Sequence, residues 1–401
     1  MEQLPKGFAA TGFSGRIKAQ GLDMALIISD RPAASAGVFT TNRVKAACIR
    51  WDQELIGNPM RAILVNSGNA NACTGARGMQ DNRELAAEVA EGFGIAPQEV
   101  FTASTGVIGV PLPIENMRAA IEELPATDDR PTSTEKGLDK AARAIMTTDL
   151  RKKVAEYSFQ VNGASVKICG IAKGSGMIHP NMATMLGFVV TDANIEAPLL
   201  QHMLKSAVEE SFNMVSVDGD TSTNDMVLAL ANGAAGVSID SPNSSSWQEF
   251  AKGLSFVCRQ LAIDIARDGE GATKLISATV HGAVSVEDAR RLARGVVGSS
   301  LVKAAFYGED ANWGRILAAM GYSGGAFDPE KVDILFRSAA GEVLLMQSGS
   351  PVPFDEDKAA RILAEDEVEV RIRLYEGTGS ATAWGCDLTY EYVKINGSYR
   401  T

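Results

Sequence analysis

One dipeptide near the middle of this chain, Ala183-Thr184, has the residue types that an N-terminal nucleophile requires. It lies in the segment KGSGMIHPNMATML, residues 173–186 of a 401-residue sequence. If the bond between the two residues were cut, Thr184 would carry a free α-amine, with an ordinary pKa of about 7.7–8.0, beside its own hydroxyl. Such an amine can take the hydroxyl proton near neutral pH, so one residue would supply nucleophile and base. The chemistry that this arrangement permits is acyl transfer.

An Ala-Thr pair alone is uninformative, but the segment around it is distinctive. KGSGMIHPNMATML resembles the signature of the ornithine acetyltransferase (glutamate N-acetyltransferase) family of arginine biosynthesis. Further stretches resemble that family in the same order along the chain: NSGNANACTG (66–75), ASTGVIG (103–109), AIMTTD (144–149), VDGDTSTND (217–225), RDGEGATK (267–274), FYGEDANWGRI (306–316) and YVKINGSYRT (392–401). A chance match at one motif does not explain a resemblance that runs nearly from end to end.

The resemblance implies a role in acetyl transfer for each of several residues. Thr184 would be the nucleophile, and Thr105-Gly106 would form the oxyanion hole through a backbone N–H or the Thr105 hydroxyl. The residues that would contact substrate are Thr147, Lys173, Thr184, Glu270, Asn396 and Thr401. The charges of Lys173 and Glu270 suit the carboxylate and the ammonium group of an amino-acid substrate.

The same resemblance implies a ping-pong reaction. Thr184 would take the acetyl group of N-acetylornithine, release ornithine, and pass the acetyl group to the α-amine of glutamate. Acetyl-CoA is a second donor in some relatives, and neither a cofactor nor a metal is expected. The chain would first cut itself at Ala183-Thr184 through an N→O acyl shift. Its fragments, 1–183 and 184–401, would stay associated as an α2β2 heterotetramer.

Two other functions fit parts of the sequence. An N-terminal-nucleophile aminopeptidase or amidohydrolase of the same architecture would use Thr184 with water as the acceptor. A non-catalytic amino-acid-binding or assembly protein would never cut itself. The choice between water and glutamate depends on the shape of the pocket, which the sequence does not decide.

The composition favours a cytoplasmic enzyme that acts on small molecules. The net charge of −11 argues against a nucleic-acid partner, which needs a basic surface. No run approaches the roughly 18 apolar residues that span a bilayer, so no membrane contact is expected. The first twenty residues resemble neither a signal peptide nor a transit peptide. The five cysteines are widely scattered, without the close pairs of a zinc or thioredoxin-type site.

The chain has three histidines, so a mechanism based on histidine has few candidates. His202 lies in a helical pattern and His281 ends a strand-like run, and both are expected on the surface or in packing. His179 lies five residues before Thr184, where several relatives carry a small residue such as alanine. A packing role is favoured because an α-amine base makes a histidine unnecessary. A role in the cleavage step stays open.

Helical and strand patterns occur in separate blocks, which favours α+β layers over a doubly wound parallel sheet. The Asn162-Gly163 pair between two alternating runs predicts a β-hairpin. Apolar spacing predicts helices over residues 198–212, 247–267 and 286–305. Clean alternation over residues 368–374 predicts a strand of an antiparallel sheet with one wet face.

The family resemblance implies a layered α/β/β/α sandwich with a smaller C-terminal α+β domain. Residues 1–183 would form the first part of the sandwich, residues 184 to about 280 would complete it, and residues 281–401 would form the C-terminal domain. A binding role for Thr401 requires that the chain end be held in place. Residues 390–395 are expected to form a strand that holds it.

Overall fold

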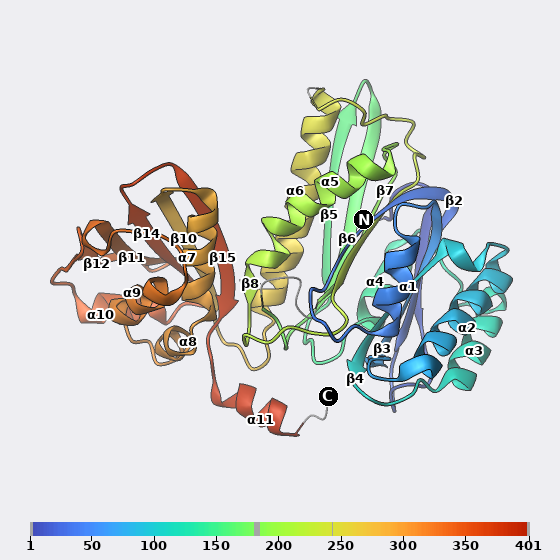
Figure 1. Ribbon diagram of the computed structural model, residues 1–401, viewed down its shortest axis with the longest axis horizontal. Coiled ribbons are helices and arrows are strands. Elements are labelled where there is room, and N and C mark those ends of the chain that lie inside the picture. The colour runs from blue at the N-terminus through green and yellow to red at the C-terminus, as the bar shows by residue number, and fades with distance from the viewer. Residues whose placement is uncertain (1–2, 180–184, 243, 399–401) are drawn as a thin grey trace.

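The computed structural model describes residues 3–179, 185–242 and 244–398. They form two lobes, each built on one sheet flanked by helices (Figure 1). Eight strands make the sheet of the first lobe: β1 (Phe8–Phe13), β2 (Met24–Phe39), β3 (Met60–Asn69), β4 (Val100–Val107), β5 (Lys153–Val161), β6 (Ala164–Lys173), β7 (Leu186–Thr191) and β9 (Met226–Ala231). The helices of this lobe are α1 (Ala47–Leu55), α2 (Gly75–Phe93), α3 (Ile114–Glu123), α4 (Glu135–Ala144), α5 (Ala197–Glu209) and α6 (Ser245–Arg267).

The long strand β2 joins two halves of the first sheet. Its first part pairs with β1 and β3, and its second part pairs with β9. Successive residues of β9 point to opposite faces, so Val227 packs toward α5 and α6 while Leu228 shares a core with Leu26 and Ile63. The two halves are therefore stacked layers, with α5 and α6 on one outer face and α1 to α3 on the other. The layered sandwich predicted from the sequence is confirmed.

The second lobe has a seven-stranded sheet among the described residues. Its strands, in spatial order, are β13 (Ser350–Pro351), β12 (Gly341–Gln347), β11 (Val332–Ser338), β14 (Glu367–Leu374), β10 (Leu275–Ala283), β15 (Gly379–Cys386) and β8 (Val215–Ser216). Its helices are α7 (Val286–Gly298), α8 (Ser300–Tyr307), α9 (Trp313–Tyr322) and α10 (Glu356–Leu363). The alternation predicted in β14 is present, but β14 is parallel to β10 and antiparallel to β11, so the sheet is mixed.

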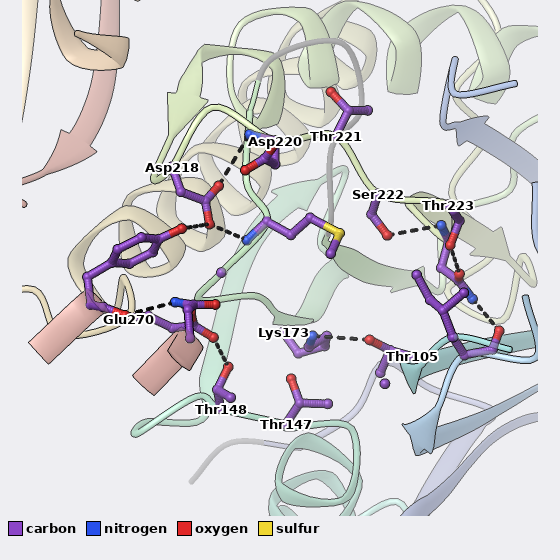
Figure 2. A pocket seen from close by; sticks show the side chains of 18 residues that line it. Thr105, Thr147, Thr148, Lys173, Asp218, Asp220, Thr221, Ser222, Thr223 and Glu270 are labelled. Atoms are coloured by element: carbon purple, nitrogen blue, oxygen red, sulfur yellow. Dashed lines mark hydrogen bonds between the residues drawn. The ribbon is translucent and has the colours of Figure 1, made fainter. Parts of the chain in front are cut away.

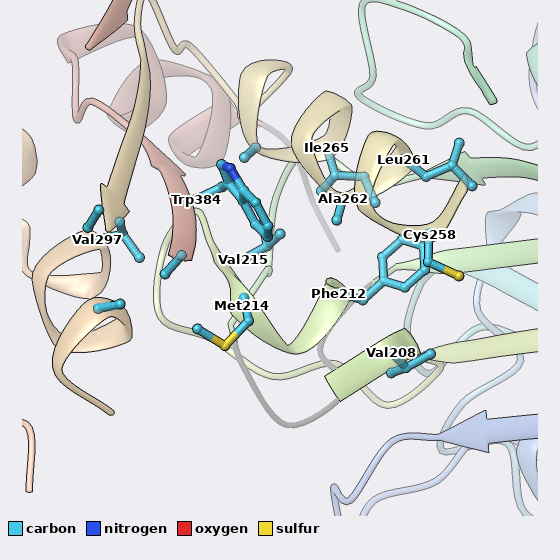
Figure 3. Close-up of a cluster of buried hydrophobic side chains, with 14 of the residues drawn as sticks. Val208, Phe212, Met214, Val215, Cys258, Leu261, Ala262, Ile265, Val297 and Trp384 are labelled. Atoms are coloured by element: carbon cyan, nitrogen blue, oxygen red, sulfur yellow. The ribbon is translucent and has the colours of Figure 1, made fainter. Parts of the chain in front are cut away.

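One apolar core continues from the first lobe into the second. The short strand β8 follows residues 212–214, pairs with β15 through Val215 and Trp384, and contacts α6 of the first lobe. Figure 3 shows the side chains that fill this junction, and the labelled ones are Val208, Phe212, Met214, Val215, Cys258, Leu261, Ala262, Ile265, Val297 and Trp384. Separating the lobes would expose this apolar surface to water, so the junction resists such motion.

Local signals in the sequence predicted several elements well. The β5–β6 hairpin turns at Asn162 and Gly163, whose φ angles of 50° and 83° suit a two-residue hairpin turn. Helices α5 and α6 match the predicted helical ranges within a few residues. The helix predicted over residues 286–305 is divided into two helices, α7 and α8. The division occurs because Ser299 adopts an extended conformation after α7 and its side chain caps α8. No described helix combines the length and apolar character needed to cross a bilayer.

The strand predicted at residues 390–395 is wrong. These residues belong to helix α11 (Tyr390–Ser398), which runs from the second lobe back beneath the first (Figure 1). The Thr389 side chain begins the helix by accepting from Tyr392 N–H and donating to the Gly271 carbonyl at 2.7 Å. Its Tyr and Val side chains imitate a strand pattern, but Tyr390 and Val393 are exposed.

Candidate active site

A cavity of about 370 Å³ lies where the loops of the first lobe meet α11. The residues that line it include Thr105, Gly106, Thr147, Lys173, Glu270 and Asn396. These six residues come from β4, the loop after α4, the end of β6, the loop after α6, and α11. The structure therefore brings together six residues that the sequence motifs nominated from distant parts of the chain (Figure 2). The other nominated residues, Ala183, Thr184 and Thr401, lie outside the described residues.

The end of β4 has a geometry suited to an oxyanion hole. Gly106 pairs with Gly68 of the parallel strand β3, and its φ is 132°. A Cβ on Gly106 would lie 2.3 Å from the Gly68 carbonyl carbon, so this position requires glycine. The Thr105 hydroxyl oxygen accepts from Lys173 Nζ at 3.2 Å. The Thr105 hydroxyl proton is not used in this hydrogen bond, so the hydroxyl can donate it to a developing oxyanion.

Lys173 forms the cationic part of the cavity wall. Its side chain is almost completely buried at the end of β6, where it pairs with Leu186 of β7. Burial lowers the pKa of Lys173 and Lys153 lowers it further, whereas the Asp149 carboxylate acts in the opposite direction. A buried cation beside an open cavity is a suitable partner for a substrate carboxylate.

Glu270 holds its carboxylate in the cavity through contacts with two neighbouring segments. Its Oε1 accepts from the Thr148 hydroxyl and its Oε2 accepts from Asn396 Nδ2, both at 2.7 Å. A Cβ on Gly176 would lie 2.4 Å from the Glu270 carboxyl, so glycine at this position allows the close approach. Helix α11 is therefore part of the site, and Asn396 orients the carboxylate that the motif RDGEG supplies.

A buried ion triad lies behind the cavity and was not predicted from the sequence. Lys153 Nζ lies 2.7 Å from both Asp149 Oδ1 and Asp268 Oδ2, and all three side chains are at most 5% exposed. Asp149 also accepts from the backbone N–H groups of Thr147 and Gly174. The triad therefore joins the three segments that carry Thr147, Lys173 and Glu270. The two aspartates lie in recognised motifs, but nothing in the sequence marked Lys153.

A second carboxylate that sequence reasoning missed positions the loop after β6. Asp218 accepts from the backbone N–H groups of Met177 at 2.5 Å and Ile178 at 2.8 Å, and from the Tyr392 hydroxyl at 3.2 Å. Burial raises the pKa of Asp218. The motif VDGDTSTND contains Asp218, so the signal was present in the sequence.

The three histidines lie away from the groups that line the cavity. His179 Nδ1 is 3.1 Å from the Ser216 hydroxyl, which attaches the end of the described loop to β8. Burial lowers the pKa of His179, and the charge of Arg294 lowers it further. His202 and His281 are exposed on α5 and β10, as expected from their sequence patterns.

We expect Asp149 to make stability depend on pH in the acid range. Burial alone would raise its pKa, but Lys173 and Lys153 outweigh this effect and hold the pKa at about 2, below the ordinary 3.8. Because the folded-state pKa of Asp149 is the lower one, the stabilisation is complete above about pH 5 and is lost as the pH falls toward about 2. It amounts to on the order of 2 kcal/mol.

The measurement is urea unfolding of an uncleaved Thr184→Ala chain, with and without Asp149→Asn. The difference in unfolding free energy between the two proteins should narrow between about pH 5 and about pH 3. A difference that stays constant over this range would contradict the assigned pKa of Asp149.

Comparison with known proteins matches residues 9–401 to the ArgJ family. This chain belongs to the ArgJ family. The arginine biosynthesis bifunctional protein ArgJ of Symbiobacterium thermophilum is 54% identical over 403 residues, which cover 99% of this chain and 98% of that protein. The protein of the same name from Caldanaerobacter subterraneus is 50% identical over 400 residues, or 100% and 98% of the two chains.

A solved ArgJ structure is also similar. The crystal structure of the arginine biosynthesis bifunctional protein ArgJ from Bacillus halodurans is 46% identical, with a TM-score of 0.50. The match covers 53% of this chain and 98% of that one. The family predicted from the sequence motifs is therefore confirmed.

Proposed function

We propose that this chain transfers the acetyl group of N-acetylornithine to glutamate through an acetyl-Thr184 ester. The observation that carries the proposal is the meeting of Lys173, Glu270 and Thr105-Gly106 in one cavity. An amino-acid substrate has a carboxylate for the lysine and an ammonium group for the glutamate, while the acyl oxygen needs the Thr105 hydroxyl. Membership of the ArgJ family supports the same activity.

In the proposed reaction the α-amine of Thr184 accepts the proton of its own hydroxyl. The oxygen attacks the acetyl carbonyl of N-acetylornithine, and Thr105-Gly106 stabilise the negative charge of the tetrahedral intermediate. The C–N bond breaks as the amine returns the proton to the leaving ornithine. The α-amine of glutamate then attacks the ester, and the same steps in reverse restore the free threonine hydroxyl and give N-acetylglutamate.

The nucleophile arises in this proposal by self-cleavage at Ala183-Thr184. Thr184 lies two positions before Leu186, the residue that pairs with Lys173, and this connection supports its role. The two fragments would remain associated through strand pairs such as β6–β7, and two such pairs of fragments would form the α2β2 particle.

The test compares transfer with hydrolysis in the same purified protein. N-acetylornithine is supplied with and without glutamate, and N-acetylglutamate and acetate are quantified. We expect N-acetylglutamate to form and acetate release to stay minor, because Lys173 and Glu270 select an amino-acid acceptor. Equal acetate release with and without glutamate would instead favour the aminopeptidase or amidohydrolase interpretation. Acetyl-CoA, the proposed second donor, is assayed in parallel.

A further inference from the structure

A second cavity, of about 400 Å³, is lined by basic side chains and lies beside the proposed transfer site. Arg43, Lys45 and Arg50 line it, and no acidic side chain is among its lining residues in the described part of the chain. The chain carries a net charge of −11. The local charge around this cavity is therefore opposite in sign to the net charge of the chain, which indicates a site for an anion.

The three cations are not neutralised by neighbouring carboxylates. Arg43 and Arg50 are exposed and form no ion pair with the described residues, and Lys45 Nζ contacts the neutral Gln53 side chain at 3.4 Å. Their charges are therefore available to a ligand. Two guanidinium groups and one ammonium group match the several charges of phosphate groups better than a single carboxylate.

The start of helix α2 adds backbone donors to the same cavity. Thr74 and Gly75 line it, and α2 has no acidic residue in its first turn. The Thr74 hydroxyl donates to Asn71 Oδ1 at 2.8 Å and does not cap the helix. The first N–H groups of this 19-residue helix therefore lack a side-chain acceptor, which adds to the attraction that the three cations exert on an anion.

Adjacent residues of one segment face the two cavities. Ala70 lines the transfer cavity and Asn71 lines the basic one. Asn42, next to Arg43, donates from Nδ2 to the carbonyl of Thr221, which also lines the transfer cavity, at 3.0 Å. The two cavities are therefore neighbours, separated by one short segment of the chain.

We propose that the basic cavity binds the phosphates of an acyl thioester carried on a nucleotide, the class of donor to which acetyl-CoA belongs. This inference rests on the proposed function, because it locates the second donor of the same nucleophile. The threonine oxygen attacks the thioester carbonyl, the C–S bond breaks, and the thiolate takes the proton held by the α-amine. The product is the same acetyl-Thr184 ester that N-acetylornithine gives.

The test measures by calorimetry the binding of four probes to the purified full-length protein, used in the cleavage state in which it is isolated. The probes are coenzyme A, adenosine 3′,5′-bisphosphate, inorganic pyrophosphate and phosphate-free pantetheine. Coenzyme A should bind best, the bisphosphate should compete with it, and pantetheine should bind at least about tenfold more weakly, because it lacks charge-assisted hydrogen bonds. Pyrophosphate binding tighter than coenzyme A would overturn the proposal in favour of a site for free polyphosphate.

Substitutions in the lining test whether coenzyme A binds in this cavity. Arg43→Gln/Arg50→Gln should raise the Kd of coenzyme A by roughly tenfold or more. Arg83→Gln/Arg373→Gln removes the same charge from exposed positions outside the lining and should leave the Kd nearly unchanged. Equal Kd values in the two double variants, or no coenzyme A binding by the unmodified protein, would overturn the proposal.

Transfer rates from the two donors distinguish a failure of this inference from a failure of the proposed function. Acetyl transfer from acetyl-CoA should fall in Arg43→Gln/Arg50→Gln, while transfer from N-acetylornithine should be unchanged. Absence of N-acetylornithine transfer in the unmodified protein would refute the proposed function, and the binding measurements would still decide whether the basic cavity holds phosphates.

Discussion

Thr184→Ala should remain a single band on a denaturing gel and lose acetyl transfer by roughly 10⁴-fold or more. The alanine removes the hydroxyl that would perform the N→O shift, so the backbone stays intact and no α-amine is released. It also removes the nucleophile itself. The remaining cavity groups can bind and polarise substrate but cannot form the covalent intermediate, which is why the loss exceeds that of a binding residue.

Thr184→Ser is the matched control, because it keeps both the hydroxyl and the potential α-amine. It should cut itself and retain activity, reduced because serine lacks the β-branch that restricts χ1. Mass spectrometry of the unmodified enzyme given N-acetylornithine without glutamate should find one added acetyl group at the fragment that begins at residue 184. An active protein with an intact Ala183-Thr184 bond would refute the mechanism.

Lys153→Met should destabilise the uncleaved Thr184→Ala chain by about 3–5 kcal/mol. The methionine fills a similar volume but leaves Asp149 and Asp268 buried without their shared cation. In a chain that can cut itself, the same substitution should raise KM for N-acetylornithine and lower kcat. Both effects follow because the triad holds the segments that carry Thr147, Lys173 and Glu270 in one arrangement.

The neighbouring residue provides a closely matched control. Lys152 pairs with Asp139, but the two side chains are 36% and 30% exposed. Lys152→Met should therefore cost less than about 1 kcal/mol and leave KM nearly unchanged. Urea unfolding and steady-state kinetics measure the two variants side by side. Equal costs for Lys152→Met and Lys153→Met would show that the buried triad has no special role.

Much of the local structure was predictable because its cause is local. The turn at Asn162-Gly163 follows from residues that tolerate positive φ, and α5, α6 and β14 follow from the period of their apolar residues. The boundary at Ser299 was missed because one capping side chain divides an otherwise continuous helical pattern. Helix α11 was missed because its side chains are mostly exposed, so apolar periodicity carried no information there.

The sequence by itself determines which reactive groups the chain contains and which family motifs they match. This information was enough to predict Thr105, Gly106, Lys173 and Glu270 as site residues. Which of those groups meet is a different question, decided by the tertiary structure. Lys153 was invisible as part of the site because a lysine in a strand pattern is ordinarily a solvated charge, and burial between two aspartates appears only when three distant segments pack together. The basic cavity is only partly of this kind, because Arg43, Lys45 and Arg50 lie within eight residues of one another in the sequence, whereas only the tertiary structure brings the N-terminus of α2 beside them.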